Sequence, residues 1–373
     1  MSLISALIEN KRVVVCCGAG GVGKTTASAA LGLAAARMGR RVLVVTIDPS
    51  KRLAEALGVD RNPVEPVRVQ AENLLSATRD GQLDAWMLDP QLISDRVVRR
   101  SSDSSHDAKS LLGNRIYQNV TAMVAGMQEY TAVQALYEFV TEGRYDTIIL
   151  DTPPSRDALR FLDAPNRVGA FLDRRIFNLF VPGEGSAIRR MTTRLLEKVM
   201  DVSFGTETRQ DLQQFFQLFG SLLSKLNHNQ TEMRDFFSSD AVSFLLVTAP
   251  TPASIEEARY FTNRAIEAHD LTVAGVLLNR SLAFASGWSL PDLSAVEGNQ
   301  ALKSALEKLM PQAKRELDQV RQHLAMEREV ADTIPHGGWV CSLPHLGPGA
   351  STLDGLSQIA DFLIRFEAKS QQT

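Results

Sequence analysis

Short apolar runs alternate with helix-like stretches along most of the chain. Residues 11–17 and 41–47 are β-branched runs, and residues 24–38 between them are rich in Ala and Leu. Such runs are typical of strands buried on both faces, and a strand–helix–strand unit of this length makes its two strands parallel. Further apolar runs predict strands at 147–150, 242–248, 273–278 and 339–343, with a helix at 254–268. The pattern predicts an α/β fold built on a doubly wound, mostly parallel sheet.

Two stretches interrupt this alternation and predict a helical insert subdomain. They lie at about 91–140 and about 165–238, inside what we take to be a single domain spanning residues 1–373. Nine of the sixteen phenylalanines fall between Phe171 and Phe237, and the apolar residues around them recur at helical spacing. These stripes either pack the core of the insert or form a groove for the apolar face of a partner helix.

Two further stretches, near the C-terminal end, predict helices. Residues 301–330 are dense in charge and are expected to form a solvated helix. Residues 353–366 are amphipathic, which fits either membrane attachment or packing on the core. The low basic charge of that segment favours packing.

Composition narrows the class of protein. The chain has 373 residues, 44% of them hydrophobic, and a formal net charge of −3, so no nucleic-acid partner is expected. Three cysteines suit a reducing compartment and exclude a disulfide framework. We find neither a secretory signal nor an apolar run of about 20 residues that would span a bilayer, and we predict a cytoplasmic protein without a transmembrane segment.

The strongest chemical signal is a glycine-rich loop between the first strand and the first helix. It consists of Gly18, Ala19, Gly20, Gly21, Val22, Gly23, Lys24 and Thr25, followed by Thr26. Glycines let backbone N–H groups converge on phosphate oxygens, Lys24 is placed to reach the β- and γ-phosphates, and Thr25 is placed to ligate Mg²⁺. This loop predicts binding of ATP and Mg²⁺ and catalysis of ATP hydrolysis, with Lys24 stabilising the transferred phosphoryl group.

Two aspartates end predicted strands near this loop. Asp48 follows the strand at 41–47, and Asp151 follows the strand at 147–150. The carboxyl ends of parallel strands face the ligand crevice, so Asp48 is predicted to orient the attacking water or to join Asp151 in the Mg²⁺ shell. The alternatives are a helix cap for Asp48, and a cap or a buried ion pair for Asp151.

Two residues are candidates for contacts with adenine. Asn279 ends the strand at 273–278, and its amide offers both a donor and an acceptor to the base. Pro344 follows the last strand and could pack on the face of the ring. Both residue types are also common in turns, and the residues alone leave that alternative open.

Together these motifs resemble the ArsA ATPase family, which contains the arsenical pump-driving subunit and the guided-entry ATPase for tail-anchored membrane proteins. The resemblance is carried by GAGGVGKTT, TIDPSKRL, LDTPPSRDALRFL and VLLNR, in the order and spacing of the family. It implies a dimer gated by nucleotide, Asp48 as the catalytic aspartate of a first switch, Asp151 in a second switch, and Asn279 and the Pro344 region as the adenine site. The resemblance also implies a helical subdomain that binds a hydrophobic client helix.

The chain departs from the family at positions that matter. Ala19 stands where members of the family have a lysine that reaches the nucleotide of the partner subunit, so we predict either a homodimer with slow hydrolysis or a heterodimer with a paralogue that carries this lysine. The Cys-x-x-Cys pair with which targeting members bind zinc is missing, and we expect no zinc. Cys16 and Cys17 are adjacent on one strand and are expected to point to opposite faces.

We therefore predict an ATP-binding, Mg²⁺-dependent ATPase whose nucleotide state drives a conformational change of a dimer. One alternative is a subunit that drives an anion or metalloid pump, for which the chain lacks a cluster of thiolates. The other is a nucleotide-dependent binding module that does not hydrolyse ATP.

Overall fold

The structure is a computed structural model in which part of the chain is described. The description covers residues 2–47, 52–59, 65–70, 81–88, 95, 98–99, 102, 104–115, 117, 127–153, 211, 214–215, 218, 232, 235–269, 271, 273–293, 300–334 and 338–366. Close contacts divide the chain into two units. Unit 1 contains Met1–Met87, Arg144–Arg156 and Asp240–Thr373, whereas unit 2 contains Leu88–Gly143 and Asp157–Ser239.

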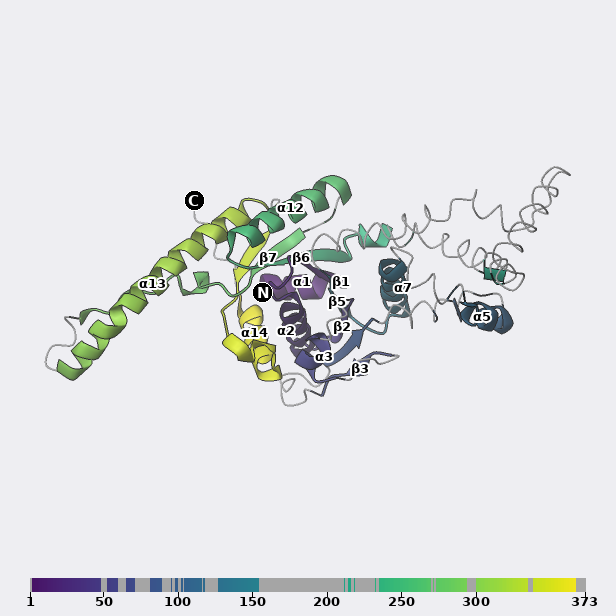
Figure 1. The fold of residues 1–373 in the computed structure, drawn as a ribbon, viewed down its shortest axis with the longest axis horizontal. Helices are drawn as coiled ribbons and strands as arrows, with labels where there is room; N and C mark the ends of the chain where they lie inside the picture. Colours follow the sequence, from purple (N-terminus) through teal and green to yellow (C-terminus); the bar gives the residue numbers. More distant parts are fainter. Residues whose placement is uncertain are drawn as a thin grey trace, which may run out of the picture. The chain divides into compact units, whose positions relative to one another are not determined.

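The described residues of unit 1 form one sheet of eight strands in the order β3-β4-β2-β5-β1-β6-β7-β8 (Figure 1). All neighbours are parallel except β3 and β4, which are antiparallel. The strands are β1 Val13–Cys17, β2 Arg41–Thr46, β3 Val67–Arg68, β4 Gln82–Met87, β5 Thr147–Asp151, β6 Val242–Thr248, β7 Val273–Leu278 and β8 Trp339–Ser342. The predicted fold class, a mostly parallel α/β sheet, is confirmed.

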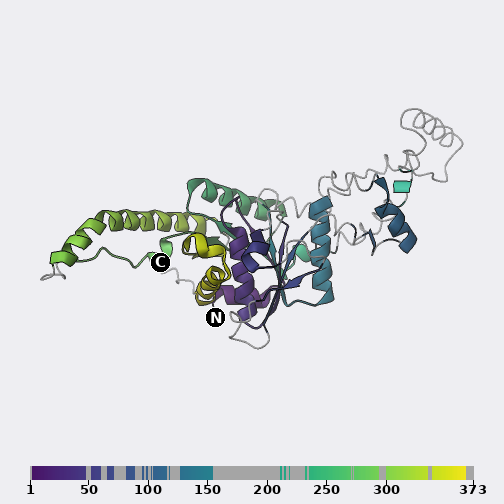
Figure 2. The same cartoon turned by 60° about the horizontal axis from the view of Figure 1, so that its bottom comes forward.

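Helices cover both faces of this sheet. Helices α2 and α14 lie on one face and α12 lies on the other (Figures 1 and 2). The described helices of unit 1 are α1 Leu3–Asn10, α2 Lys24–Arg37, α3 Arg52–Leu57, α12 Pro252–His269, α13 Gln300–Ala331 and α14 Leu353–Arg365, with 3-10 turns at Ala283–Ala285 and Gly347–Ser351. None of the described helices combines the length and the apolar character needed to cross a membrane.

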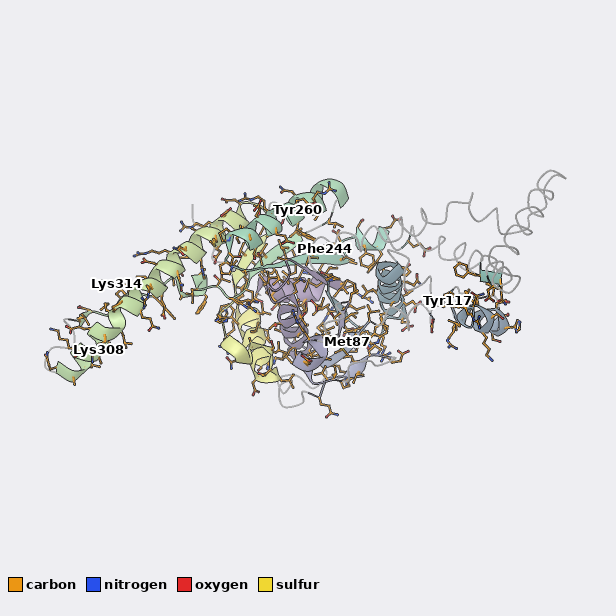
Figure 3. The ribbon with its side chains drawn as sticks, viewed as in Figure 1. Met87, Tyr117, Phe244, Tyr260, Lys308 and Lys314 are labelled. Carbon is orange, nitrogen blue, oxygen red and sulfur yellow. The ribbon has the colours of Figure 1, made fainter. Side chains whose placement is uncertain are left out.

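Side chains of each central strand alternate between these two faces. Val14 and Cys16 of β1 belong to the core under α2, whereas Cys17 is buried outside that core. Successive residues of a strand point to opposite faces, so the two adjacent cysteines are separated by the sheet, as predicted. Phe244 fills the interior along β6 (Figure 3).

Helix α2 approaches the sheet unusually closely at Gly32. A Cβ atom added to Gly32 would lie 2.3 Å from Cγ2 of Val44 and 3.2 Å from Cδ1 of Leu83. The rest of the helix is rich in alanine, whose small side chain also permits close packing. Because α2 starts at Lys24, this packing fixes the position of the end of the glycine-rich loop relative to the sheet.

Helix α14 packs on the core, which confirms the packing interpretation of the C-terminal segment. Its residues Leu356, Ile359, Ala360 and Leu363 are buried in the core that α2 also covers. Arg37 at the end of α2 donates hydrogen bonds to Asp361, at 2.8 Å, and to the side-chain and main-chain oxygens of Ser357. These hydrogen bonds join α14 to α2, the helix that follows the glycine-rich loop.

The structure contains elements that the sequence analysis did not predict. Strand β4 extends the sheet beyond β2 and places Asp84 inside it. Arg68 forms an ion pair with that carboxylate, and the hydroxyl of Tyr145 donates to it at 2.9 Å. The carboxylate is tolerated because both partners satisfy it. Helix α1 was also missed, although Ser2 caps it by accepting a hydrogen bond from the N–H of Ser5.

Helix α13 is a 32-residue helix, as the charge-rich stretch at 301–330 predicted. Its C-terminal third packs on the rest of unit 1. Val320 and Val330 are buried there, and Glu329 forms an ion pair with Arg259 of α12. The part that carries Lys308 and Lys314 extends away from the sheet (Figure 3).

In unit 2 the described helices include α5 Ser105–Leu112 and α7 Met127–Glu142. The two insertions meet at Asn114, whose amide donates to the main-chain oxygen of Asp211 at 2.8 Å. The side-chain oxygen of Asn114 accepts from the N–H of Tyr117. Most of the apolar stripes predicted at 165–238 lie outside the described residues.

Candidate functional site

The glycine-rich loop leaves the sheet at its centre. Strand β1 is buried along its whole length between β5 and β6, and the loop connects it to α2. Gly20 and Gly21 are exposed at the crown of the loop, whereas Ala19 and Val22 are buried against the core. The main chain at the crown is thus open to a ligand while its flanks are anchored.

Two of the glycines are required by close approaches as well as by backbone angles. Gly18 has φ of 153°, and a Cβ atom there would lie 1.9 Å from the main-chain oxygen of Val247 on β6. Gly23 has φ of 93°, and a Cβ atom there would lie 2.3 Å from Nδ2 of Asn279. Larger residues at either position would push the loop off the ends of β6 and β7.

Lys24 is folded back across the loop. Its Nζ donates to the main-chain oxygens of Gly18 at 3.0 Å and of Ala19 at 2.8 Å, and the residue is only 8% exposed. A positive charge is therefore held inside the loop, next to the N-terminal end of α2. Both features favour an anion at this position.

Thr25 and Asp151, two of the three predicted metal-binding residues, are in direct contact. Oγ1 of Thr25 donates to Oδ2 of Asp151 at 2.8 Å, and Oγ1 of Thr46 donates to the same oxygen at 3.0 Å. Asp151 is fully buried at the end of β5, in register with Cys16 on β1 and Thr46 on β2. The sequence analysis missed Thr46, for which the only available signal was its place at the end of a strand.

The oxygen atoms of this pair suit Mg²⁺. A hydroxyl and a carboxylate are hard oxygen ligands, and adjacent ligands of an octahedral Mg²⁺ lie about 2.9 Å apart. The distance of 2.8 Å between the two oxygens matches that spacing. The residues present therefore fit the metal that the loop sequence implied.

Asp48, the predicted catalytic residue, lies outside the described residues. The preceding residue, Ile47, contacts the site, because its N–H donates to the main-chain oxygen of Asp151 at 3.2 Å. Thr26 is half-buried in the first turn of α2. The catalytic role of Asp48 remains a prediction.

Asn279 lies against the loop. It follows β7, is 7% exposed, and its Nδ2 donates to the main-chain oxygen of Val22 at 2.8 Å. Its Oδ1 accepts from the N–H of Arg280, a residue with a positive φ of 57°. Pro344 comes shortly after β8, the strand next to β7. The adjacent Leu343 accepts a hydrogen bond from the N–H of Ser281 through its main-chain oxygen. The adenine contacts predicted for Asn279 and Pro344 remain predictions.

The three cysteines are buried thiols. Burial raises the pKa of the Cys16 thiol to about 12, and burial also raises the pKa of the Cys17 and Cys341 thiols. A thiol with a raised pKa is a poor source of the thiolate that soft metals require. Among the residues that the structure describes, no group of three or more His, Cys, Asp and Glu residues could hold a metal ion.

Comparison with known proteins gives a family match along most of the chain. The model of the family described as anion-transporting ATPase (ArsA ATPase) matches residues 11–319. A putative arsenical pump-driving ATPase of Aquifex aeolicus is 26% identical over 253 residues, which cover 66% of this chain and 58% of that protein. An ATPase get3 of Aspergillus terreus is 24% identical over 267 residues, or 70% of this chain and 72% of that protein.

A third relative is an uncharacterized protein of Streptomyces coelicolor, 30% identical over 197 residues. That alignment covers 52% of this chain and 46% of the relative. The chain therefore spans about half the length of several curated relatives that it matches, with shares of 58% and 46% for the two bacterial proteins named.

Proposed function

The chain belongs to the anion-transporting ATPase family, and we propose that it binds ATP with Mg²⁺ and hydrolyses the bond to the γ-phosphate. The observation that carries the proposal is the direct contact of Thr25 with Asp151 beside a loop that encloses Lys24. An anion-binding helix terminus, an enclosed ammonium group and a pair of hard oxygen ligands are the parts that phosphoryl transfer needs.

Each residue of the candidate site that the structure describes has a role in this proposal. The main-chain N–H groups of residues 20–25 bind the phosphates, and Lys24 exchanges the main-chain oxygens of Gly18 and Ala19 for oxygens of the β- and γ-phosphates. Thr25 and Asp151 hold Mg²⁺, which supplies positive charge to the phosphates when it is bound. Thr46 keeps the carboxylate of Asp151 in place by donating to it.

The chemical step is attack of water on the γ-phosphorus. The water forms a new P–O bond as the bond between the γ-phosphorus and the bridging oxygen breaks, and ADP leaves with that oxygen. One proton of the water stays on inorganic phosphate and the other passes to solvent. We propose that Asp48 orients this water, on the basis of its position two residues after Thr46 in the chain.

We further propose that nucleotide binding opens and closes a dimer. Ala19 contributes no positive charge to the loop, and in this proposal a lysine of another subunit supplies a further cation to the γ-phosphate beside Lys24. The partner is either a second copy of this chain or a paralogue with a lysine at the corresponding position. Sedimentation with ATP, with ADP and without nucleotide tests the dimer, and a mass of one chain in all three conditions would contradict it.

The helical insertions are proposed to receive an apolar partner helix. Support comes from the aromatic and apolar residues concentrated at 165–238 and from the contact between the two insertions at Asn114. Nucleotide-dependent binding of an apolar helical peptide would support this role, whereas equal affinity in ATP and ADP would contradict it.

The central experiment measures phosphate release by the full chain with and without Mg²⁺. Lys24→Ala removes charge-assisted hydrogen bonds, each worth about 1.5–3 kcal/mol, so turnover should fall by at least about tenfold. Lys308→Ala is the matched control, because Lys308 is exposed on α13 (Figure 3). Wild-type protein without Mg²⁺-dependent release, or a Lys24→Ala variant that matches Lys308→Ala, would refute the proposed function.

A further inference from the structure

The hydrogen bond between Asn279 and the glycine-rich loop joins distant parts of the chain. Nδ2 of Asn279 donates to the main-chain oxygen of Val22 at 2.8 Å, across 257 positions of sequence. The contact is tight, because a Cβ atom at Gly23 would lie 2.3 Å from the same nitrogen. The amide therefore rests directly on the peptide group between Val22 and Gly23.

That peptide group links the amide of Asn279 to the inside of the loop. The oxygen of Val22 and the N–H of Gly23 belong to one planar trans peptide, in which the oxygen and the hydrogen point in opposite directions. A hydrogen bond that fixes the oxygen on the Asn279 side therefore fixes the N–H on the other side. Gly23 has a positive φ of 93°, which glycine adopts readily, so the backbone of this turn alone does not fix the orientation of the peptide group.

Asn279 is itself firmly held. Its main-chain N–H donates to the main-chain oxygen of Thr248 on β6 at 2.8 Å, and its Oδ1 accepts from the N–H of Arg280 at 3.0 Å. Two residues further on, the N–H of Ser281 donates to Leu343 after β8 at 2.9 Å. The amide thus has a fixed orientation that is set by three neighbouring strands.

We propose that Asn279 is a positioning residue for the phosphates, which orients the N–H of Gly23 by holding the oxygen of Val22. This role rests on the proposed nucleotide site and differs from recognition of adenine. It predicts that Asn279 contributes equally to the binding of every ligand that carries the phosphates, whatever base is attached.

The test compares three ligands in the presence of Mg²⁺: ATP, GTP and inorganic tripolyphosphate. Calorimetric titration of full-length Asn279→Ala should give dissociation constants about tenfold higher for all three, equal to about 1.4 kcal/mol. Asn279→Asp keeps the shape of the side chain and places an oxygen against the oxygen of Val22, so its loss should be larger. This second variant decides the question if Asn279→Ala does not fold.

Ser281→Ala is the matched control. Ser281 is fully buried in the same loop, but its hydroxyl accepts from the N–H of Ala283 and not from the phosphate loop. Its removal should lower the urea midpoint of unfolding and leave all three affinities unchanged. A loss of affinity in Asn279→Ala that Ser281→Ala shares would mean that Asn279 acts only through stability, and would overturn the proposal.

Two further outcomes separate the inference from the proposed function. Loss of ATP affinity in Asn279→Ala with unchanged affinity for GTP and tripolyphosphate would assign Asn279 to the base and overturn the positioning role. Wild-type protein that binds none of the three ligands would overturn the nucleotide site itself.

Discussion

Replacing Gly32 with alanine gives opposite predictions from helix propensity and from the structure. Gly32 lies in the middle of α2, where a change from Gly to Ala normally stabilises a helix by about 1 kcal/mol. In the folded protein, however, the added Cβ atom would lie 2.3 Å from Val44, and ordinary contact begins at 3.4 Å. The helix would have to move by about an ångström, away from three strands at once, because Leu83 and Ile149 lie within 4 Å as well.

The expected magnitude follows from these two opposing terms. Overpacking of a well-filled core costs about 1–3 kcal/mol, which exceeds the propensity gain. We expect Gly32→Ala to lower the free energy of unfolding by about 1 kcal/mol and Gly32→Val to lower it further. Because α2 starts at Lys24, the same shift should also weaken ATP binding.

Urea unfolding followed by tryptophan fluorescence measures this change in the appropriate unit. The three tryptophans, Trp86, Trp288 and Trp339, all belong to unit 1, so the signal reports unfolding of the sheet. Gly349→Ala is the matched control, because a Cβ atom there meets nothing within 4 Å. A Gly32→Ala protein that is more stable than the wild type would refute the argument that close packing of α2 on the sheet decides the outcome.

Three further predictions concern the site and its surroundings. Thr25→Ala should reduce Mg²⁺-dependent phosphate release at least about tenfold, and Thr25→Ser, which keeps the hydroxyl on Asp151, should restore it; equal activity of both variants would contradict the metal role. The three buried cysteines should resist a thiol reagent in native protein and all react in urea, since burial raises their pKa values; rapid native labelling would contradict their burial. His323 accepts a hydrogen bond from the N–H of Leu282, and burial lowers its pKa. The unfolded protein therefore binds the proton more readily than the folded protein does. The free energy of unfolding should fall as the pH drops below about 6.5. Urea midpoints should depend less on pH in His323→Asn, and an unchanged pH dependence would exclude His323 as its source.

The sheet was predictable from the sequence where strands are buried on both faces. Strands β1, β2 and β5 to β8 are mostly apolar runs, which can be recognised in the sequence without knowing their neighbours in the sheet. Strand β4 was missed because Asp84 interrupts its apolar residues. What makes that carboxylate acceptable is an ion pair with Arg68 and a hydrogen bond from Tyr145, and neither partner can be identified from a local pattern.

In the candidate site, too, some residues could be predicted from the local sequence and others could not. The loop at 18–25 could be predicted because its chemistry is local, and Thr25 and Asp151 followed from their places at a helix start and a strand end. The contribution of Thr46 and the contact of Asn279 with Val22 depend on residues that meet only after the sheet has formed. Sequence reasoning therefore predicted the residues of the candidate phosphate site more completely than the residues that hold them in place.

The connections into unit 2 bear on any attempt to remove it. The two stretches of unit 2 join β4 to β5 and β5 to β6, and these strands run parallel in the sheet without being neighbours. A parallel crossover needs about a dozen residues or more, so the connection from β4 to β5 and the connection from β5 to β6 each need at least that length. Excising unit 2 with short linkers would leave β5, and with it Asp151, unable to reach its slot. A fragment that keeps only the sheet of unit 1 would have to retain two connecting segments of this length.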